Sequence, residues 1–148
     1  MKYHLAQINV GRFHVPAEDP RNADFMNNLD TINALAESAP GFIWRLKDDT
    51  GNATSIRAFD DPAILVNMSV WESIESLQRF AYRSAHVKFL RRRAEWFADF
   101  GGPMMALWWV KAGRLPPASE GRAMLAHITA HGSTPTAFTF REKFAAPG

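Results

Sequence analysis

The side chain best suited to move a proton is that of His86, which shares one face of a predicted helix with Leu90, Arg93 and Phe97. An imidazole titrates near neutral pH, so it could take a proton from a phenol or an enol. Three interpretations stay open: a histidine satisfied by a hydrogen bond inside the protein, a general acid or base, and an axial ligand of a metal cofactor.

Four neutral polar side chains form the second candidate group. Gln7 and Asn9 lie two residues apart in one predicted strand, and Asn67 and Ser69 do so in another, so each pair points to one side of its strand. Together they would orient a planar, oxygen-bearing ligand, and the Asn9 amide could stabilise a developing oxyanion. The alternative is a polar seam whose members bond to one another or to water.

Arginines and tryptophans complete the candidate site. Arg45 alternates with apolar residues in the segment 42–46 and would offer a positive charge to an anionic ligand, although an interface salt bridge explains it equally well. Trp71 would form a wall, although tryptophans more often serve as core packing. The predicted catalytic residues are therefore His86 and Asn9, and the predicted substrate-binding residues are Gln7, Asn67, Ser69, Trp71, Arg45, Arg93 and Trp109.

The segments that hold these residues alternate between strand and helix patterns. Strands show apolar residues at every second position, and helices show them three or four residues apart. Asp19-Pro20 and Ser73 are typical helix starts, and Pro40-Gly41 and Gly132 are typical stops. The predicted order is strand 3–13, helix from 20 to 39, strand 42–46, a return strand or its stub at 56–59, strand 64–71, a helix from 74 to 97 bent near 82–84, strand 104–110 and helix 119–131.

This order is the split βαββαβ pattern of a ferredoxin-like α+β domain with an antiparallel sheet. The chain is predicted to be a single domain over residues 1–148, with a core of 3–112 and an added C-terminal helix and tail over 113–148. Phe138 and Phe140 in this tail would pack against the body or a partner subunit, or close the pocket.

The two faces of the predicted sheet differ in polarity. Ala6, Ile8 and Val10, with the apolar positions of segment 64–70, are expected under the helices. The other face would then lie without a helical cover and would expose large apolar side chains, which is uncommon for a monomer. We therefore expect a homodimer in which two sheets pack face to face, with cavities between sheet and helices. The residues of this second face are Leu5, Gln7, Asn9, Leu65, Asn67, Ser69, Trp71 and either Trp108 or Trp109.

Composition narrows the function classes. A net charge of +2 spread along the chain predicts no nucleic-acid or membrane partner, and of the run Arg91 to Arg93 at least two are expected to be ordinary solvated charges. The absence of cysteine excludes disulfides and thiolate chemistry. No leader pattern precedes the first strand, so a cytoplasmic location is expected. His127 and His131, four residues apart, are expected to face outward rather than to bind a metal.

The segment SVWESIESLQRFAYRSAH, residues 69 to 86, resembles the dimeric α/β-barrel superfamily of antibiotic-biosynthesis monooxygenases. There a strand ending in Trp-Glu-Ser leads into a helix that later carries a histidine. The pieces LAQINV, DPRNADF, APGFIWRL, VNMSVWESIESL, YRSAHVKFLRRRAEWF, LWWV and HGSTPTAFTF resemble more closely a bacterial family of unknown function within that superfamily, over nearly the whole chain. This resemblance implies the dimeric barrel fold.

The wider superfamily includes cofactor-free quinone-forming oxygenases and haem-degrading oxygenases. In the haem degraders, a histidine of the second helix binds the iron and an asparagine of the first strand lies near it. His86 and Asn9 fall at similar places, so the resemblance implies either no cofactor or haem with His86 as its ligand.

Three hypotheses for the function follow. The first is a monooxygenase-like enzyme that acts on a hydrophobic phenolic or quinol-type compound, with His86 as the proton-transfer residue. The second is a ligand-binding or structural dimer without catalysis, and the third is a haem-binding protein. No nucleophile motif, phosphate loop or cluster of metal ligands supports a hydrolase, a kinase or a zinc enzyme.

Overall fold

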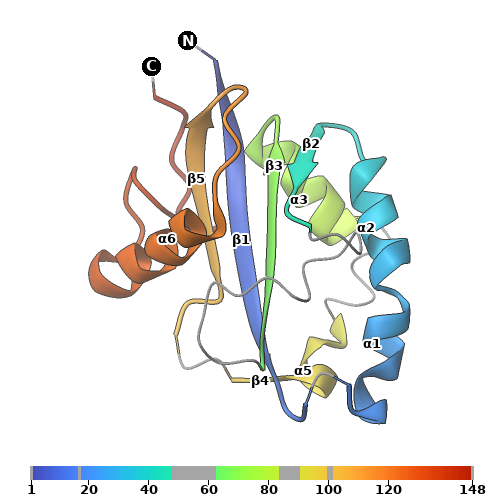
Figure 1. Cartoon of the computed structure of the whole chain (residues 1–148). Coiled ribbons are helices and arrows are strands. Elements are labelled where there is room, and N and C mark those ends of the chain that lie inside the picture. The colour runs from blue at the N-terminus through green and yellow to red at the C-terminus, as the bar shows by residue number, and fades with distance from the viewer. Residues whose placement is uncertain (1, 17, 48–62, 84–90, 100–101, 148) are drawn as a thin grey trace.

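The computed structural model describes residues 2–16, 18–47, 63–83, 91–99 and 102–147. The main strands and helices follow one another in the predicted order, except that residues 97–98, at the end of the predicted second helix, form a short strand (Figure 1). The elements are β1 (Tyr3–Phe13), η1 (Pro20–Asn22), α1 (Ala23–Asn27), α2 (Leu29–Glu37), β2 (Phe42–Arg45), β3 (Ile64–Trp71), α3 (Ile74–Arg83), α5 (Arg93–Trp96), β4 (Phe97–Ala98), β5 (Met105–Lys111) and α6 (Ala118–His131).

The strands form one antiparallel sheet in which β1 is central. It pairs with β3 along one edge, with Gln7 opposite Ser69, and with β5 along the other, with Leu5 opposite Trp109. β2 extends the sheet beyond β3, and the two-residue β4 pairs with the end of β1 next to β5. The predicted α+β, ferredoxin-like fold with an added C-terminal helix is therefore confirmed.

The predicted helix starts are confirmed by their hydrogen bonds. The Asp19 side chain accepts from the backbone N–H of Arg21 at 2.9 Å, and the Ser73 hydroxyl accepts from that of Ser76 at 3.1 Å. Each cap satisfies a backbone donor at a helix start that has no partner within its own helix. The first helix differs from the prediction because it divides into η1, α1 and α2, with a break at Asn28.

The prediction of which sheet face carries the first helices is wrong. Ala36 of α2 and Leu77 of α3 pack with Leu5 and Trp71, on the face that was expected to lie uncovered. The opposite, apolar face packs against α6 (Figure 1). There Gly121 brings the helix so close that a Cβ at this position would lie 2.8 Å from the Ile8 Cδ1 atom. The alternation of apolar and polar residues along the strands correctly predicted that the two sheet faces differ. Both faces are nevertheless buried, so the polarity of a face did not show which helices cover it.

This correction removes the reason given for a homodimer, although not the prediction itself. The apolar face is closed within one chain, since Ile8, Met68 and Trp108 are all at most 2% exposed. The helix-covered face of the sheet likewise buries Leu5 and Trp71. A second copy is therefore not needed to cover these side chains, and the homodimer stays a prediction.

Several expectations lie partly or wholly outside the described residues. The return strand at 56–59, His86 and part of the predicted bend near 82–84 do so. None of the described helices is long and apolar enough to cross a membrane. At the end of α6, Gly132 has a φ of +72°, which agrees with the predicted glycine stop.

Candidate functional site

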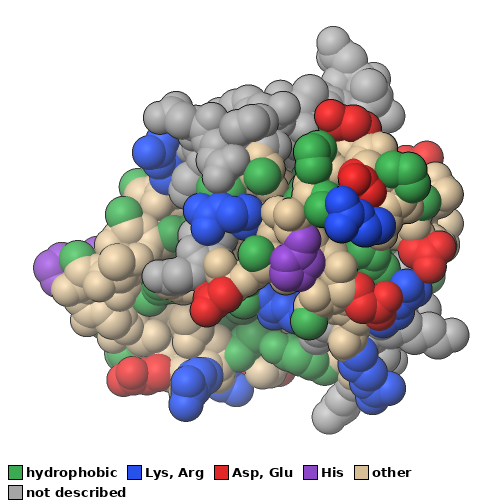
Figure 2. Space-filling model, turned by 90° about the horizontal axis from the view of Figure 1, so that it is seen from below, with side chains coloured by type: hydrophobic (Ala, Val, Ile, Leu, Met, Phe, Trp, Pro, Cys, Tyr) green, Lys and Arg blue, Asp and Glu red, His purple; other side chains and the backbone are tan. Residues whose placement is uncertain are grey.

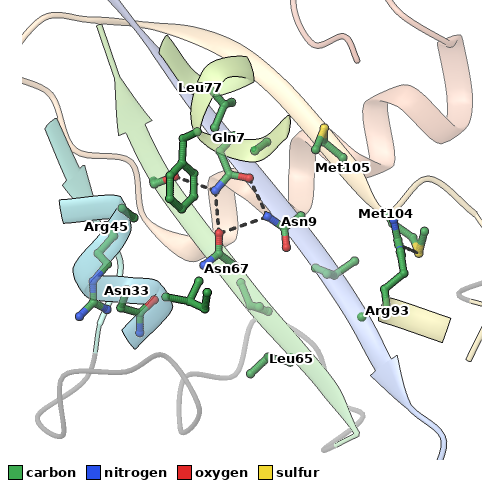
Figure 3. A pocket seen from close by; sticks show the side chains of 18 of the residues that line it. Gln7, Asn9, Asn33, Arg45, Leu65, Asn67, Leu77, Arg93, Met104 and Met105 are labelled. Carbon is green, nitrogen blue, oxygen red and sulfur yellow. Dashed lines mark hydrogen bonds between the residues drawn. The ribbon is translucent and has the colours of Figure 1, made fainter. Parts of the chain in front are cut away.

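A cavity of about 240 Å³ lies on the sheet face covered by α1, α2 and α3 (Figure 3). Its floor is formed by β1 and β3, and α5 and the start of β5 add to its walls. Apolar and aromatic side chains make up most of the lining, as is usual for small-molecule sites.

Four polar side chains on the floor form one hydrogen-bonded group, which we call the amide cluster: Gln7, Asn9, Asn67 and Ser69 (Figure 3). The Gln7 amide nitrogen donates to Asn67 Oδ1 and to Ser69 Oγ, both at 2.8 Å. The Asn9 amide nitrogen donates to Gln7 Oε1 at 3.0 Å and to Asn67 Oδ1 at 3.1 Å. The predicted proximity of these two strand pairs is therefore confirmed.

The strand register explains why the amide cluster forms. Gln7 is opposite Ser69 and Asn9 is opposite Asn67 in the antiparallel pair of β1 and β3. Opposite residues share a sheet face, with side chains near enough to bond. Gln7 is 2% and Ser69 is 7% exposed, whereas both asparagines are exposed. The cluster thus runs from a buried anchor to the open side of the cavity.

Trp71 connects the amide cluster to the aromatic wall. Its indole Nε1–H donates to Ser69 Oγ at 2.8 Å, and its ring stacks on Phe80 with a centroid separation of 5.3 Å. Phe42 meets the same indole edge to face at 5.5 Å. Trp71 is 1% exposed, so it is a fixed wall whose polar group is satisfied, as the sequence analysis expected.

A glycine near the end of β1 makes room at the other end of the cavity. A Cβ on Gly11 would lie 2.5 Å from the Phe97 ring, which packs over this strand. Phe97 also stacks on Phe13 and meets Phe25 edge to face. These rings connect β1 and β4 with α1, and the end of the cavity depends on their packing.

Two arginines contribute positive charge to the lining. Arg45, whose side chain is 10% exposed, forms an ion pair with Glu37 at 3.5 Å. Arg93 donates from Nη2 to the Met104 sulfur at 2.9 Å. No aspartate, glutamate or histidine belongs to the lining within the described ranges.

Of the predicted site residues, most line the cavity and one does not. Trp109 shares the sheet face, but its indole N–H donates to the Phe144 carbonyl at 2.9 Å and so holds the C-terminal tail. Its prediction as a substrate-binding residue is not supported, because the cavity ends before this part of β5. His86 lies outside the described residues, and its role stays a prediction. The residues that line the cavity are Gln7, Asn9, Asn67, Ser69, Trp71, Arg45 and Arg93.

Sequence reasoning missed the lining residues that come from the helices. Ile32 and Asn33 of α2 and Tyr82 of α3 line the cavity because these helices cover the face that was expected to be bare. Phe140 also lines it and meets Tyr82 edge to face at 5.7 Å. The tail therefore helps to close the pocket, which was one of the two roles considered for it.

The histidine pair of α6 is remote from this cavity. The rings of His127 and His131 are 4.8 Å apart, and the His127 Nε2 atom is 2.7 Å from the Thr134 hydroxyl. The described residues contain no group of three side chains that could hold a metal ion.

Comparisons with solved structures place this fold among known proteins. A protein of unknown function from Nitrosomonas europaea is 14% identical, with a TM-score of 0.51 over 78% of this chain and 96% of its own. SnoaB, a cofactor-independent oxygenase from Streptomyces nogalater, is 14% identical, with a TM-score of 0.47 over 77% and 97%. A monooxygenase from Streptomyces coelicolor in complex with nanaomycin D is 17% identical, with a TM-score of 0.44 over 77% and 92%.

The comparison with curated proteins finds no match. The family described as "Domain of unknown function (DUF3291)" matches residues 4–148, which is nearly the whole chain. This confirms the predicted resemblance to a bacterial family of unknown function, and the chain belongs to the DUF3291 family.

Proposed function

We propose that this protein binds a flat, hydrophobic small molecule bearing oxygen atoms, of phenolic or quinol type, and acts on it as a monooxygenase-like enzyme. The observation that carries the proposal is the amide cluster, a preformed polar group on the floor of an otherwise largely apolar and aromatic cavity. A few well-placed polar groups in an apolar pocket orient a ligand and select its functional groups.

The amide cluster keeps hydrogen-bonding capacity for a ligand. The bonds within the cluster use both N–H groups of Asn9 and the oxygen of Asn67. Among the described residues, no partner takes the Asn67 amide N–H groups or the Asn9 amide oxygen. A donor and an acceptor are therefore presented side by side at the open end, which suits a phenol or a hydroxyquinone.

The chemistry assigned to this pocket is oxidation of a phenol by dioxygen. A phenol such as 1-naphthol would lose its O–H proton, and reaction with one O2 would give 1,4-naphthoquinone and one water. The two electron pairs that reduce O2 come from the substrate: one oxygen atom bonds to C4 as the C4–H and O–O bonds break, and the other leaves as water with that hydrogen and the phenolic proton. We propose that an Asn67 amide N–H stabilises the phenolate in place of Asn9, whose amide nitrogen donates within the amide cluster, and that His86 is the base.

Calorimetric titration with 1-naphthol and 1,4-naphthoquinone tests the binding. Asn67→Leu keeps the size of the side chain and removes the amide, so the affinity should fall about tenfold, the worth of one hydrogen bond to an oxygen that carries partial charge. Asn27→Leu makes the same change at an exposed position outside the cavity and should bind as the wild type does. Equal affinities for the two variants would show that the amide cluster does not contact the ligand.

A second candidate function is binding without turnover. It is favoured by the described lining, which contains no aspartate, glutamate or histidine to serve as a general base. An oxygen electrode separates the two functions with the same ligand. Uptake of O2 with formation of naphthoquinone supports the enzyme, whereas tight binding of 1-naphthol without O2 uptake supports the binding protein.

A further inference from the structure

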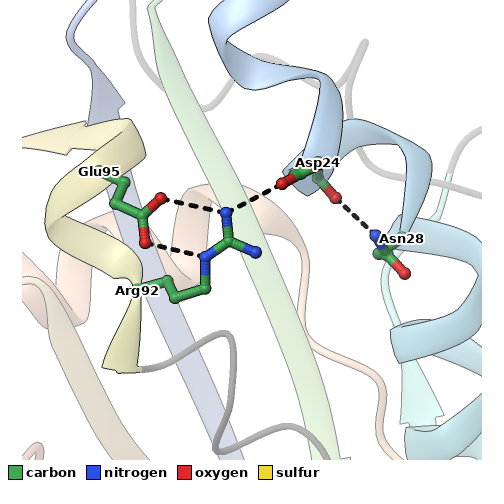
Figure 4. A network of polar contacts seen from close by, with 4 residues as sticks. All are labelled: Asp24, Asn28, Arg92 and Glu95. Atoms are coloured by element: carbon green, nitrogen blue, oxygen red, sulfur yellow. Dashed lines mark hydrogen bonds and ion pairs between the residues drawn. The ribbon is translucent and has the colours of Figure 1, made fainter.

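Arg91 and Arg92 precede α5, and Arg93 is its first residue. These three arginines have different surroundings. Arg92 donates to the Glu95 carboxylate at 2.8 and 3.0 Å and to Asp24 of α1 at 3.0 Å (Figure 4). Its guanidinium also lies 4.6 Å from the centroid of the Trp96 ring. Arg92 is therefore compensated by two carboxylates and ties α5 to α1. Arg91 is exposed and is not part of the cavity lining.

Arg93 differs from Arg92 in both direction and partner. It lines the cavity, and its hydrogen bond goes to the thioether sulfur of Met104 at 2.9 Å. A thioether is a weak acceptor and carries no charge to balance a guanidinium. Within the described ranges, Arg93 has no carboxylate at ion-pair distance. Arg93 is exposed, and its guanidinium borders the cavity with no anion among the described residues to receive it.

The charge balance of the cavity lining agrees with this observation. Arg45 and Arg93 are its only charged members among the described residues, and Arg45 already has Glu37 as a partner. Figure 3 shows the two arginines on opposite sides of the amide cluster, with Asn9 on the side of Arg93. The outer surface at this end of the molecule is not uniformly positive, since basic and acidic side chains are mixed there (Figure 2). The excess positive charge is therefore a feature of the cavity lining.

We propose that Arg93 is an anion-recognition residue, and that the ligand of this cavity is an aromatic acid. The inference rests on the proposed function and adds the ligand's charge and class. Its carboxylate would take the two parallel N–H donors of Arg93, an arrangement that guanidinium and carboxylate groups form readily. Its phenolic or quinone oxygens would meet Asn9 and Asn67, and its rings would fill the apolar part of the cavity.

The test compares two ligands that differ only in charge at one group: 1-hydroxy-2-naphthoate and its primary amide, 1-hydroxy-2-naphthamide. Titration calorimetry near neutral pH should give wild-type protein a preference of about tenfold for the acid, as a charge-assisted hydrogen bond implies. Arg93→Gln should abolish the preference, because it weakens binding of the acid more than binding of the amide. Arg91→Gln removes the same charge from a neighbouring exposed position and should keep the preference.

The outcomes separate this inference from the proposed function. If wild-type protein binds acid and amide equally, or if Arg93→Gln keeps the preference, the assignment of Arg93 is overturned while ligand binding stands. If neither compound binds, the proposed function fails and the inference fails with it. Arg93→Lys supplies a second variant in case the glutamine variant folds poorly, because it keeps the charge and loses the fork. A partial preference in Arg93→Lys supports the assignment, and an undiminished preference counts against two-point recognition.

Discussion

Substitution of Gly41 by alanine should destabilise the protein through a contact that can be isolated. Gly41 lies between α2 and β2 with a φ of +86°, and its carbonyl accepts from the Glu72 N–H at 2.8 Å. A Cβ at this position would lie 2.4 Å from the Ser76 Cβ atom. The side chain of Ser76 is fixed in turn, because its hydroxyl donates to the Ser73 carbonyl at 3.0 Å at the start of α3.

Two terms add to the expected cost. An alanine held at positive φ costs about 1–2 kcal/mol wherever it occurs. The forced movement of Ser76 adds the loss of its cap contacts and local overpacking, about 1–3 kcal/mol. Gly113 supplies a matched control, since it has a φ of +92° but nothing within 4 Å of an added Cβ. Gly113→Ala should therefore show the first term alone.

Urea unfolding of both variants measures the difference directly. We expect Gly41→Ala to lose more free energy of unfolding than Gly113→Ala by at least about 1 kcal/mol. In a Ser76→Gly background the Cβ that collides is gone, so the excess should disappear. If the two alanine variants are equally stable, or if the excess persists without the Ser76 side chain, the contact argument is refuted.

Three further predictions concern charge, the tail and the histidine. The Arg114 guanidinium holds the pKa of the Glu120 carboxyl below its ordinary value of 4.5. The ion pair therefore stabilises the fold fully above pH 4.5, and this contribution is lost as the pH falls through the folded pKa. In urea unfolding from neutral to acidic pH, the free energy of unfolding should fall less steeply for Glu120→Gln than for the wild type. Trp109→Phe removes the bond to the Phe144 carbonyl and should cost about 1 kcal/mol with ligand affinity unchanged, by the same titrations as above. His86→Ala should lower turnover of a phenolic substrate by about a hundredfold or more if His86 moves the proton; a Soret band in wild-type protein with added haemin, absent from the variant, would instead make it an axial ligand.

The order of elements was predictable because each carries its own local signal. Asp19 and Ser73 cap helices through side-chain oxygens, and Gly132 stops α6 at positive φ. The amide cluster was predictable for the same reason, since a spacing of two within a strand fixes the face. The pattern could not predict which helices cover which sheet face, because Leu5 and Trp71 on one face are as fully buried as Ile8 on the other.

That error carried through to the site. With the first helices expected on the other face, the residues of α2 had no reason to meet the amide cluster. Trp109 was chosen from its sheet face, but whether a side chain on that face lines the cavity depends on where the tail lies, and the Phe144 carbonyl takes its N–H. Arg93 lines the cavity as expected, although the helix face on which this rested lies partly outside the described residues, and its bond to the Met104 sulfur required the structure.

One face of β3 packs in the core and the other lines the cavity. Substitutions at adjacent residues of this strand should therefore affect mainly either stability or ligand binding. Met68 is 1% exposed in the core under α6, and Gly121 of that helix lies against its sulfur. Met68→Ala should therefore cost about 2–5 kcal/mol of unfolding free energy and leave ligand affinity unchanged, because the cavity lies on the opposite face. Asn67→Ala removes an exposed side chain that faces the cavity and the acceptor of one Gln7 N–H, so it should cost about 1–2 kcal/mol and weaken ligand binding. Unfolding midpoints and calorimetric affinities for both variants measure the two effects; a loss of affinity in Met68→Ala as large as that in Asn67→Ala would show that the faces are coupled through the strand.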